Sequence, residues 1–328
     1  MSRLPRRLAL PLAVVGTLLL AACGGGSDSA STTTAGGDDA PGGAFEPVTI
    51  EHRYGSTEID ERPKRIVSLD TQWTDALLAL DAPPVGYLAD YNVPEGFPWR
   101  GDLLADSTEM KATDALPMEQ IAALRPDLIV VTYFARDDAD YEKLRAIAPT
   151  ITTLTTNEVD TWQDITAAAG KVLGESEQAE AVVASVDDQV ADVAKELPGL
   201  AGKTFAFANY VPGDAIYVVS DPDDGAVVLF TQLGMEISPA IIEAGEGESG
   251  RVKVGFERTD LLDADYLALL TNGADPESIP SYQSLPAVKS GAVSLLDYAD
   301  ATALNTPTPL SIPYVLEVIH PQLVAAAG

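Results

Sequence analysis

Short apolar runs alternate with longer amphipathic stretches along most of the chain. Runs rich in β-branched residues, such as 65–69 and 128–132, are typical of strands buried on both faces. Residues 71–80 instead repeat their apolar positions every three or four residues, which indicates an amphipathic helix. Because strands that alternate with helices pair in parallel through βαβ units, this pattern predicts an α/β fold.

The longest uninterrupted helical pattern covers residues 175–197 and ends at a Pro-Gly pair. A helix of about 22 residues is roughly 33 Å long, which is enough to run between two lobes. After it, the alternation of strand and helix starts again. We therefore predict an N-terminal lobe at 45–174, a connecting helix at 175–197 and a similar C-terminal lobe at 198–328, each lobe with a central and mostly parallel sheet.

Two matched segments support the idea of similar lobes. The segment "LRPDLIVVTYF" (124–134) corresponds to "LDADYLALLTN" (262–272), since each has a leucine, an aspartate, an apolar strand and a polar exit. Ligands of open parallel sheets bind beyond the carboxyl ends of the strands. Two lobes that face each other would bring both sets of strand ends into one cleft.

Residues at the predicted strand ends are therefore candidates for ligand binding. Tyr133 and Arg136 follow one central strand, and Asn209, Tyr210 and Asn272 follow strands of the second lobe. We expect Phe134 to turn into the core, because side chains alternate along a strand. Further candidates on nearby loops and helices are Trp73, Tyr91, Trp99, Lys111 and Arg251.

Three of these candidates have a structural alternative. Tyr133 could be a strand-end aromatic packed under a neighbouring helix, and Trp73 could be an apolar residue of a helix face. Asn272 precedes a glycine and could belong to a plain turn. The cleft hypothesis requires Tyr133 and Asn272 to face the same gap.

The start of the chain has the pattern of a targeting segment. Three arginines precede an apolar run at residues 8–20, which is too short for a good membrane span. The run ends in Leu-Ala-Ala-Cys, which resembles the bacterial lipoprotein cleavage box, and Cys23 is the only cysteine. We predict that 1–23 is a lipoprotein signal peptide and that Cys23 is lipidated. The alternative is an ordinary secretory signal with a chance cysteine.

Residues 24–44 contain no large apolar residue, so we predict a flexible tether between the lipid and the folded body. The formal net charge is −30 and the isoelectric point is about 4.1, which makes nucleic acid a poor partner. The chain has one cysteine and two histidines, so it has no intramolecular disulfide, and the spacing of these residues excludes a structural zinc site.

Several longer motifs resemble one family in their order and spacing. They are "PKRIVSLDTQWTDALLALDAPPVGY", "LPMEQIAALRPDLIVV", "YEKLRAIAPTI" and "LPAVKSGAV". Together they resemble the ferric-siderophore, haem and cobalamin substrate-binding proteins of ABC importers, from about Pro47 to the C-terminus. The resemblance implies two α/β lobes joined by one long helix, and a monomer lipid-anchored to the outer face of the cytoplasmic membrane.

The resemblance also implies a function and a partner. The protein would capture an iron(III)–siderophore complex in the interlobe cleft and deliver it to an ABC permease. Haem or cobalamin binding is the alternative, as is a lipid-tethered interaction protein without transport. Permease docking through a carboxylate of each lobe would use Asp75 and, less clearly matched, Asp223 or Asp224. Lys111 occupies the stretch where many members have an arginine.

No cofactor is expected, because a siderophore supplies the six oxygen ligands of its iron. Bare metal ions and histidine-ligated haem fit poorly with so few histidines and cysteines. The chain also lacks a G-x-S-x-G elbow, a G-x-G-x-x-G turn after the first strand and a Walker loop. We therefore predict a binding protein and not an enzyme.

Overall fold

The computed structural model describes residues 45–112, 115–135, 137–155, 160–248 and 250–328. The predicted signal peptide (1–23), its lipidation site Cys23 and the predicted tether (24–44) lie outside the described residues. Within the described part of the chain, no helix combines the length and apolarity needed to cross a membrane. The body from Phe45 to Gly328 forms one compact unit.

The first lobe is built on a five-stranded parallel sheet with the order β5-β4-β3-β6-β7. Its strands are β3 (Ile66–Ser68), β4 (Gly86–Leu88), β5 (Thr108–Met110), β6 (Leu128–Val130) and β7 (Thr150–Ile151). Its helices are α1 (Thr71–Ala79), α2 (Met118–Ala123), α3 (Asp138–Arg145) and α4 (Trp162–Leu173). An antiparallel hairpin, β1 (Val48–His52) and β2 (Gly55–Ile59), precedes the sheet, and a short 3₁₀ helix η1 (Pro98–Arg100) follows β4.

The second lobe has a sheet with the order β11-β9-β8-β12-β13, and β10 pairs with the start of β8. Only β9 runs antiparallel to its neighbours. The strands are β8 (Thr204–Val211), β9 (Ala215–Val219), β10 (Glu236–Ile237), β11 (Arg251–Val254), β12 (Tyr266–Leu270) and β13 (Val293–Leu296). The helices are α6 (Val228–Gln232), α7 (Pro239–Ala244), α8 (Pro286–Ser290), α9 (Tyr298–Asn305) and α10 (Ser311–Ala327). The 3₁₀ helices are η2 (Pro198–Leu200), η3 (Gly225–Val227), η4 (Phe256–Leu262), η5 (Pro276–Ser278) and η6 (Tyr282–Ser284).

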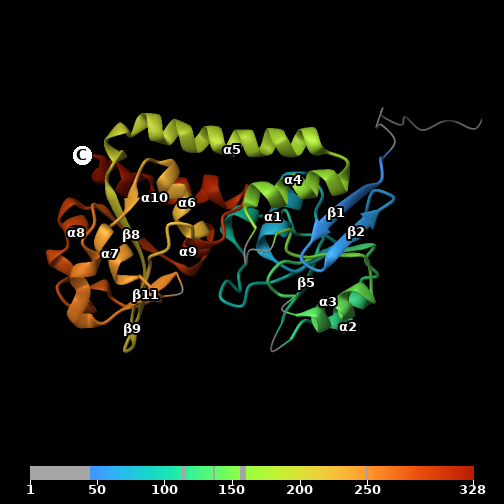
Figure 1. The fold of residues 1–328 in the computed structure, drawn as a ribbon, viewed down its shortest axis with the longest axis horizontal. Coiled ribbons are helices and arrows are strands. Elements are labelled where there is room, and N and C mark those ends of the chain that lie inside the picture. Colours follow the sequence, from blue (N-terminus) through green and yellow to red (C-terminus); the bar gives the residue numbers. More distant parts are fainter. Residues whose placement is uncertain (1–44, 113–114, 136, 156–159, 249) are drawn as a thin grey trace, which may run out of the picture. The chain divides into compact units, whose positions relative to one another are not determined.

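Helix α5 (Ser176–Glu196) joins the two lobes with 21 residues, or about 32 Å. Figure 1 shows it running past α4 of the first lobe and past α6 and α10 of the second, and it packs against all three. The predicted class, two α/β lobes with mostly parallel sheets joined by one long helix, is confirmed. The lobe boundaries at 174 and 198 stay a prediction.

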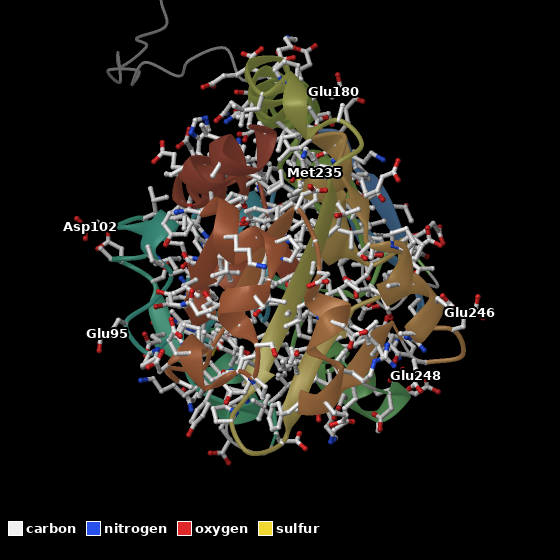
Figure 2. All side chains as sticks on the ribbon, turned by 90° about the vertical axis from the view of Figure 1, so that its left-hand side faces the viewer. Glu95, Asp102, Glu180, Met235, Glu246 and Glu248 are labelled. Carbon is white, nitrogen blue, oxygen red and sulfur yellow. The ribbon has the colours of Figure 1, made fainter. Side chains whose placement is uncertain are left out.

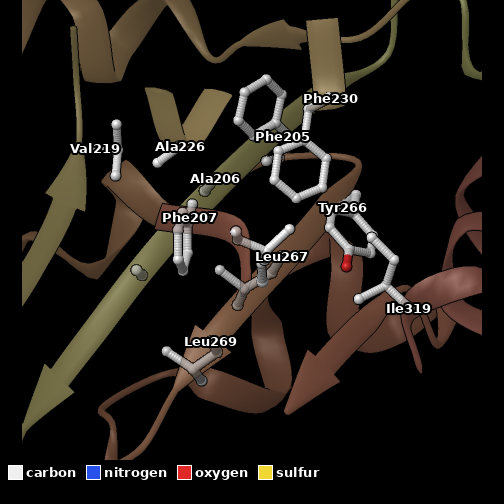
Figure 3. Close-up of a cluster of buried hydrophobic side chains, with 14 of the residues drawn as sticks. Phe205, Ala206, Phe207, Val219, Ala226, Phe230, Tyr266, Leu267, Leu269 and Ile319 are labelled. Carbon is white, nitrogen blue, oxygen red and sulfur yellow. The ribbon is translucent and has the colours of Figure 1, made fainter. Parts of the chain in front are cut away.

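Each sheet is covered by apolar side chains on both faces. In β6, Leu128 and Val130 face one core cluster of the first lobe, while Ile129 faces a second cluster on the other side. In the second lobe, Phe205 of β8 stacks on Phe230 of α6 with ring centroids 4.5 Å apart (Figure 3). These alternating contacts explain why the strands read as continuous apolar runs.

The two aspartates of the matched segments have the same structural task. Asp127, just before β6, accepts hydrogen bonds from the backbone N–H groups of Lys64 and Arg65, each at 2.8 Å, beside the start of β3. Asp265, just before β12, accepts one from Thr204 at 2.8 Å, at the start of β8. Both carboxylates therefore tie the amino ends of paired strands together, and the carboxyl ends are left for other interactions.

Candidate functional site

Tyr133 lies just beyond the carboxyl end of β6 and remains partly open to solvent. Its side chain is 43% exposed, and its ring contacts that of Phe134 with centroids 4.8 Å apart. Phe134 packs against the core of the first lobe, as expected from the alternation of side chains. The position of Tyr133 leaves part of its side chain available for a ligand.

Asp70 holds the backbone next to Tyr133 in place. Its carboxylate caps α1 by accepting from the N–H of Trp73 at 2.9 Å, and it accepts from the N–H of Thr132 at 2.8 Å. Asp70 thereby links the ends of β3 and β6. Burial raises the pKa of Asp70 to about 6, although the hydrogen bonds from Trp73 and Thr132 act in the opposite direction.

Two carboxylates, those of Asp70 and Asp90, affect the phenol of Tyr133. Burial raises the pKa of its phenol, and the carboxylates of Asp70 and Asp90 and the phenol of Tyr298 raise it further, while Arg100 opposes them. The phenol of Tyr133 therefore stays protonated near neutral pH. It can donate a hydrogen bond to a ligand oxygen, and it is a poor phenolate ligand for a metal ion.

Tyr298 is a residue of the second lobe that lies in the vicinity of Tyr133. It follows the carboxyl end of β13 and begins α9, whose start is held by reciprocal hydrogen bonds between Asp297 and Asp300. Tyr298 is 38% exposed. Burial and the carboxylate of Asp90 raise the pKa of its phenol, and a hydrogen bond with Asn92 acts in the opposite direction. The loop after β4, with Asp90 and Asn92, therefore meets α9 of the other lobe.

Tyr298 is not among the residues predicted from the sequence, although a signal was present. The residue follows a predicted strand in "GAVSLLDYAD", as Tyr133 follows "DLIVVT". We predicted Asn209, Tyr210 and Asn272 as the strand ends of the second lobe that meet Tyr133. The structure instead brings Tyr298 close enough to raise the pKa of Tyr133.

A pocket of about 330 Å³ in the second lobe is lined by Phe207, Ala208 and Asn209 of β8 and by Leu270 at the end of β12. The polar residues that line it are Asn209, Tyr217, Arg251 and Asn305. Ala301 and Asn305 of α9 also line it, and they follow Tyr298 by three and seven residues. Residues with this spacing share one face of a helix, so α9 connects Tyr298 with the pocket.

Arg251, the first residue of β11, is the basic residue of this pocket. Its guanidinium donates to Oδ1 of Asn305 at 3.0 Å and lies 3.5 Å from Oδ2 of Asp224. The side chain of Arg251 is 38% exposed. Asp224 also caps η3 by accepting from the N–H of Ala226. The carboxylate of Asp224 is therefore engaged by Arg251 and by the start of η3, whereas the neighbouring Asp223 is exposed.

Asn209 and Asn272 are in direct contact at the ends of β8 and β12. Nδ2 of Asn272 donates to Oδ1 of Asn209 at 2.6 Å and to the carbonyl of Tyr210 at 2.9 Å. Asn272 has a φ of 53°, in the left-handed region. These bonds fix a turn after β12, which agrees with the plain-turn alternative, while Asn209 keeps its place in the pocket lining.

Burial corrects two of the predicted binding residues. The ring of Trp73 is fully buried in the core of the first lobe. Tyr210 is 5% exposed, and its hydroxyl is hydrogen-bonded to Ser278 at 2.9 Å. Neither ring offers a face to a ligand. Both follow predicted strands. The direction of the Tyr210 ring depends on the pleat of β8, and that of the Trp73 ring depends on the rotation of α1 about its axis. The sequence specifies neither.

The remaining predicted residues are exposed or half-buried, or they lie outside the described residues. Tyr91 is 89% exposed, in the loop that carries Asp90 and Asn92. Trp99 is half-buried, stacks on Phe97 with centroids 4.5 Å apart and donates from Nε1 to Asp75 at 2.7 Å. Lys111 is exposed and paired with Glu109 at 3.0 Å. Arg136 lies outside the described residues.

Asp75 is fully buried, which makes its predicted role in permease docking wrong. Its carboxylate accepts hydrogen bonds from Nε of Arg100 at 2.6 Å, from Trp99, and from the hydroxyl of Thr308 at 2.7 Å. Thr308 belongs to the second lobe. The family resemblance implied an exposed acid at this position, but the carboxylate lies in a buried ion pair at the contact between the lobes.

Comparisons with known proteins agree with this architecture. The profile of the periplasmic binding protein family matches residues 66–299. The probable siderophore-binding lipoprotein YfiY of Bacillus subtilis is 28% identical over 267 residues, which cover 76% of this chain and 80% of that protein. The ferric enterobactin-binding periplasmic protein FepB of Escherichia coli is 27% identical over 272 residues, covering 76% of this chain and 84% of that protein.

Among solved structures, a periplasmic solute binding protein from Mycobacterium smegmatis superposes with a TM-score of 0.74 at 26% identity. The superposition covers 86% of this chain and 99% of that chain. The family match begins at β3 and ends in α9, so it includes both sheets and the strand ends that carry Tyr133 and Tyr298. The chain belongs to the periplasmic binding protein family.

Proposed function

We propose that the protein captures an iron(III)–siderophore complex between its two lobes and delivers it to an ABC permease. The observation that carries the proposal is that two partly exposed phenols from opposite lobes, Tyr133 after β6 and Tyr298 after β13, lie close enough for Tyr298 to raise the pKa of Tyr133. Aromatic rings offer flat apolar surface together with a polar group, which suits an organic chelate. The names of relatives such as YfiY and FepB point to the same class of cargo.

The chemistry of these residues suits binding better than catalysis. A siderophore surrounds its iron with oxygen atoms, so the protein needs only surfaces and hydrogen-bond donors for the outside of the complex. Tyr133 and Arg251 supply such donors, and Asn209 adds an amide to the pocket. We propose a non-enzymatic role without a resident cofactor, in which the iron complex is cargo.

Docking to the permease needs exposed carboxylates, whereas the carboxylate of Asp75 is buried. We infer that Glu119 and Glu257 take this role. They occupy matched positions, since each stands eight residues before the aspartate of its segment, Asp127 or Asp265. Both are exposed and lie in the first turn of their helices, α2 and η4. Asp223 is the remaining exposed candidate of the original prediction.

The positions of Glu119 and Glu257 support this inference. Helix α2 connects the end of β5 to the start of β6, and η4 connects the end of β11 to the start of β12. A crossover helix between parallel strands begins at the carboxyl edge of the sheet. Each glutamate therefore lies at the edge of its sheet where the candidate site is found, which places one exposed acid per lobe on the side that would face a permease.

We also propose that lipidation of Cys23 holds the body at the outer face of the cytoplasmic membrane, as a monomer. YfiY is named a lipoprotein, as is YhfQ of Bacillus subtilis. Labelling with a palmitate analogue in the producing cell tests this proposal. Labelling that persists in a Cys23→Ser variant would contradict it.

Binding itself is tested by quenching of tryptophan fluorescence, because Trp99 of the first lobe lies half-buried against the core of the second lobe. Ferrichrome, ferrioxamine B, ferric enterobactin, ferric dicitrate, haem and cobalamin are titrated separately. We expect saturable quenching by at least one ferric siderophore at sub-micromolar concentration. Binding of haem or cobalamin alone would favour the alternative cargo. No binding, no shift in the melting temperature and capture of a protein partner would favour a tethered interaction protein.

A further inference from the structure

Carboxylates dominate the surroundings of the two phenols. Asp90 raises the pKa of both Tyr133 and Tyr298, and Asp70 raises that of Tyr133. Asp90 belongs to the loop after β4, and its Oδ1 accepts a hydrogen bond from the N–H of Asn92 at 2.8 Å. No cation is paired with Asp90 within the described ranges. Among the described residues, the negative charge of Asp90 near the two phenols is therefore not cancelled by a paired cation.

Three cations of the described residues, Arg100, Arg251 and Lys111, are already paired with carboxylates. The guanidinium of Arg100 lies 2.6 Å from Asp75 and is buried, and Arg251 lies 3.5 Å from Asp224. Lys111, after β5, is paired with Glu109 at 3.0 Å. A paired cation attracts an anion much less than a free one does, because the field of the carboxylate cancels most of its own. These three cations belong to the described residues, which do not include Arg136.

From these charges, and on the basis of the proposed function, we propose that the cargo is a ferric chelate without net negative charge. Three hydroxamates, each with one negative charge, cancel the charge of iron(III), and a chelator with an additional amine makes the complex a cation. Three catecholates instead leave the complex a trianion, which Asp90 and its neighbours would repel. The proposed class is therefore the ferric trihydroxamates.

The hydrogen-bonding groups of the site fit such a complex. The protonated phenol of Tyr133 can donate to a neutral carbonyl or hydroxamate oxygen. Arg251 has N–H groups besides those that reach Asn305 and Asp224, and these can donate to a further oxygen. Neutral acceptors satisfy these donors without placing a second negative charge beside Asp224.

Titration calorimetry with chelates of different charge tests the proposal. The probes are ferrioxamine B, a cation, ferrichrome, which is neutral, and the anions ferric enterobactin and ferric dicitrate. We expect ferrioxamine B or ferrichrome to bind at least tenfold more tightly than either anion. An anion that binds as tightly as both hydroxamates would overturn the charge class but leave the proposed function intact. Failure of all four would overturn both.

A charge-neutralising variant tests whether Asp90 is responsible. Asp90→Asn keeps the oxygen that accepts from Asn92, so the loop should retain its shape. We expect its affinity for ferric enterobactin to rise about tenfold, with the affinity for ferrichrome unchanged within about twofold. The matched control is Glu180→Gln, which removes the same charge from α5, where Figure 2 shows Glu180 projecting outward. Equal effects of the two variants, or none, would contradict the assignment.

Discussion

The hydroxyl of Thr308 donates a 2.7 Å hydrogen bond to Oδ2 of Asp75, although the two residues are 233 positions apart. The same carboxylate is paired with Arg100 and bonded to Trp99. This buried cluster joins α1 of the first lobe to the segment between α9 and α10 of the second. It thereby helps to set where α9, and with it Tyr298, lies relative to Tyr133.

Removal of the Asp75 carboxylate should destabilise the protein strongly. In Asp75→Ala, the guanidinium of Arg100 remains buried without a counterion, which costs about 3 kcal/mol or more. Urea denaturation of the variant should show a lower midpoint. Asp192→Ala breaks an exposed ion pair with Lys195 and should leave the midpoint unchanged. Equal midpoints for Asp75→Ala and the wild type would show that the cluster contributes little.

Tyr298 should contribute to ligand affinity without supporting the fold. Tyr298→Ala removes a ring that is 38% exposed, so we expect a loss of affinity of about fivefold to tenfold. Tyr298→Phe keeps the ring and should lose less. Fluorescence titration with the tightest-binding ferric siderophore measures both variants. An unchanged affinity of Tyr298→Ala, with an unchanged melting temperature, would remove Tyr298 from the site.

Protonation of Asp70 should increase the free energy of unfolding in mild acid. Its pKa is raised from the ordinary value of 3.8 to about 6, so the folded state binds a proton more tightly than the unfolded state. The stabilising contribution is complete below the ordinary pKa and is lost as the pH rises through about 6. In Asp70→Asn, this pH dependence between about 4 and 6 should disappear. Urea denaturation over that range checks it, and an unchanged profile would contradict the assignment.

His52 should act with the opposite sign. Its ring is buried between Thr57 and Thr152, with hydrogen bonds of 3.0 and 3.1 Å, and burial lowers its pKa below the ordinary value of 6.5. The contribution of neutral His52 is present above pH 6.5 and is lost as the pH falls through the lowered pKa.

In His52→Gln, the loss of stability on acidification below about pH 6.5 should be smaller than in the wild type. Because Asp70 acts oppositely over part of the same range, the two variants are compared separately and in combination. Identical acid profiles for His52→Gln and the wild type would show that this ring does not control the hairpin at low pH.

The proposed docking glutamates should separate transport from binding. Glu119→Lys and Glu257→Lys reverse exposed charges and leave the candidate site untouched, so ligand affinity should remain within about twofold. Uptake of the iron complex by cells that carry the permease should fall at least tenfold in the double variant. Glu180→Lys on α5 is the matched control and should transport normally. Normal uptake by the double variant would favour Asp223 or another acid.

Much of the architecture could be predicted because it follows from local patterns. The apolar run at β6 and its counterpart at β12 indicated buried parallel strands, and the long amphipathic pattern indicated α5. Tyr133 was predicted at a strand end and is found there, partly exposed. Tyr210 was predicted on the same principle and is buried, because strand geometry determines which edge of the sheet a residue occupies but not how its ring packs.

The sequence by itself determined the fold class, the connecting helix and the strands whose ends could form a site, since period and length of apolar runs depend on neighbouring residues. The tertiary structure alone decided which strand ends meet. It brought Tyr298 into electrostatic range of Tyr133 and enclosed Asp75 with Thr308, pairs that are separated by long stretches of chain. Such contacts depend on how the two lobes pack against each other, and no local pattern of hydrophobic and polar residues records that packing.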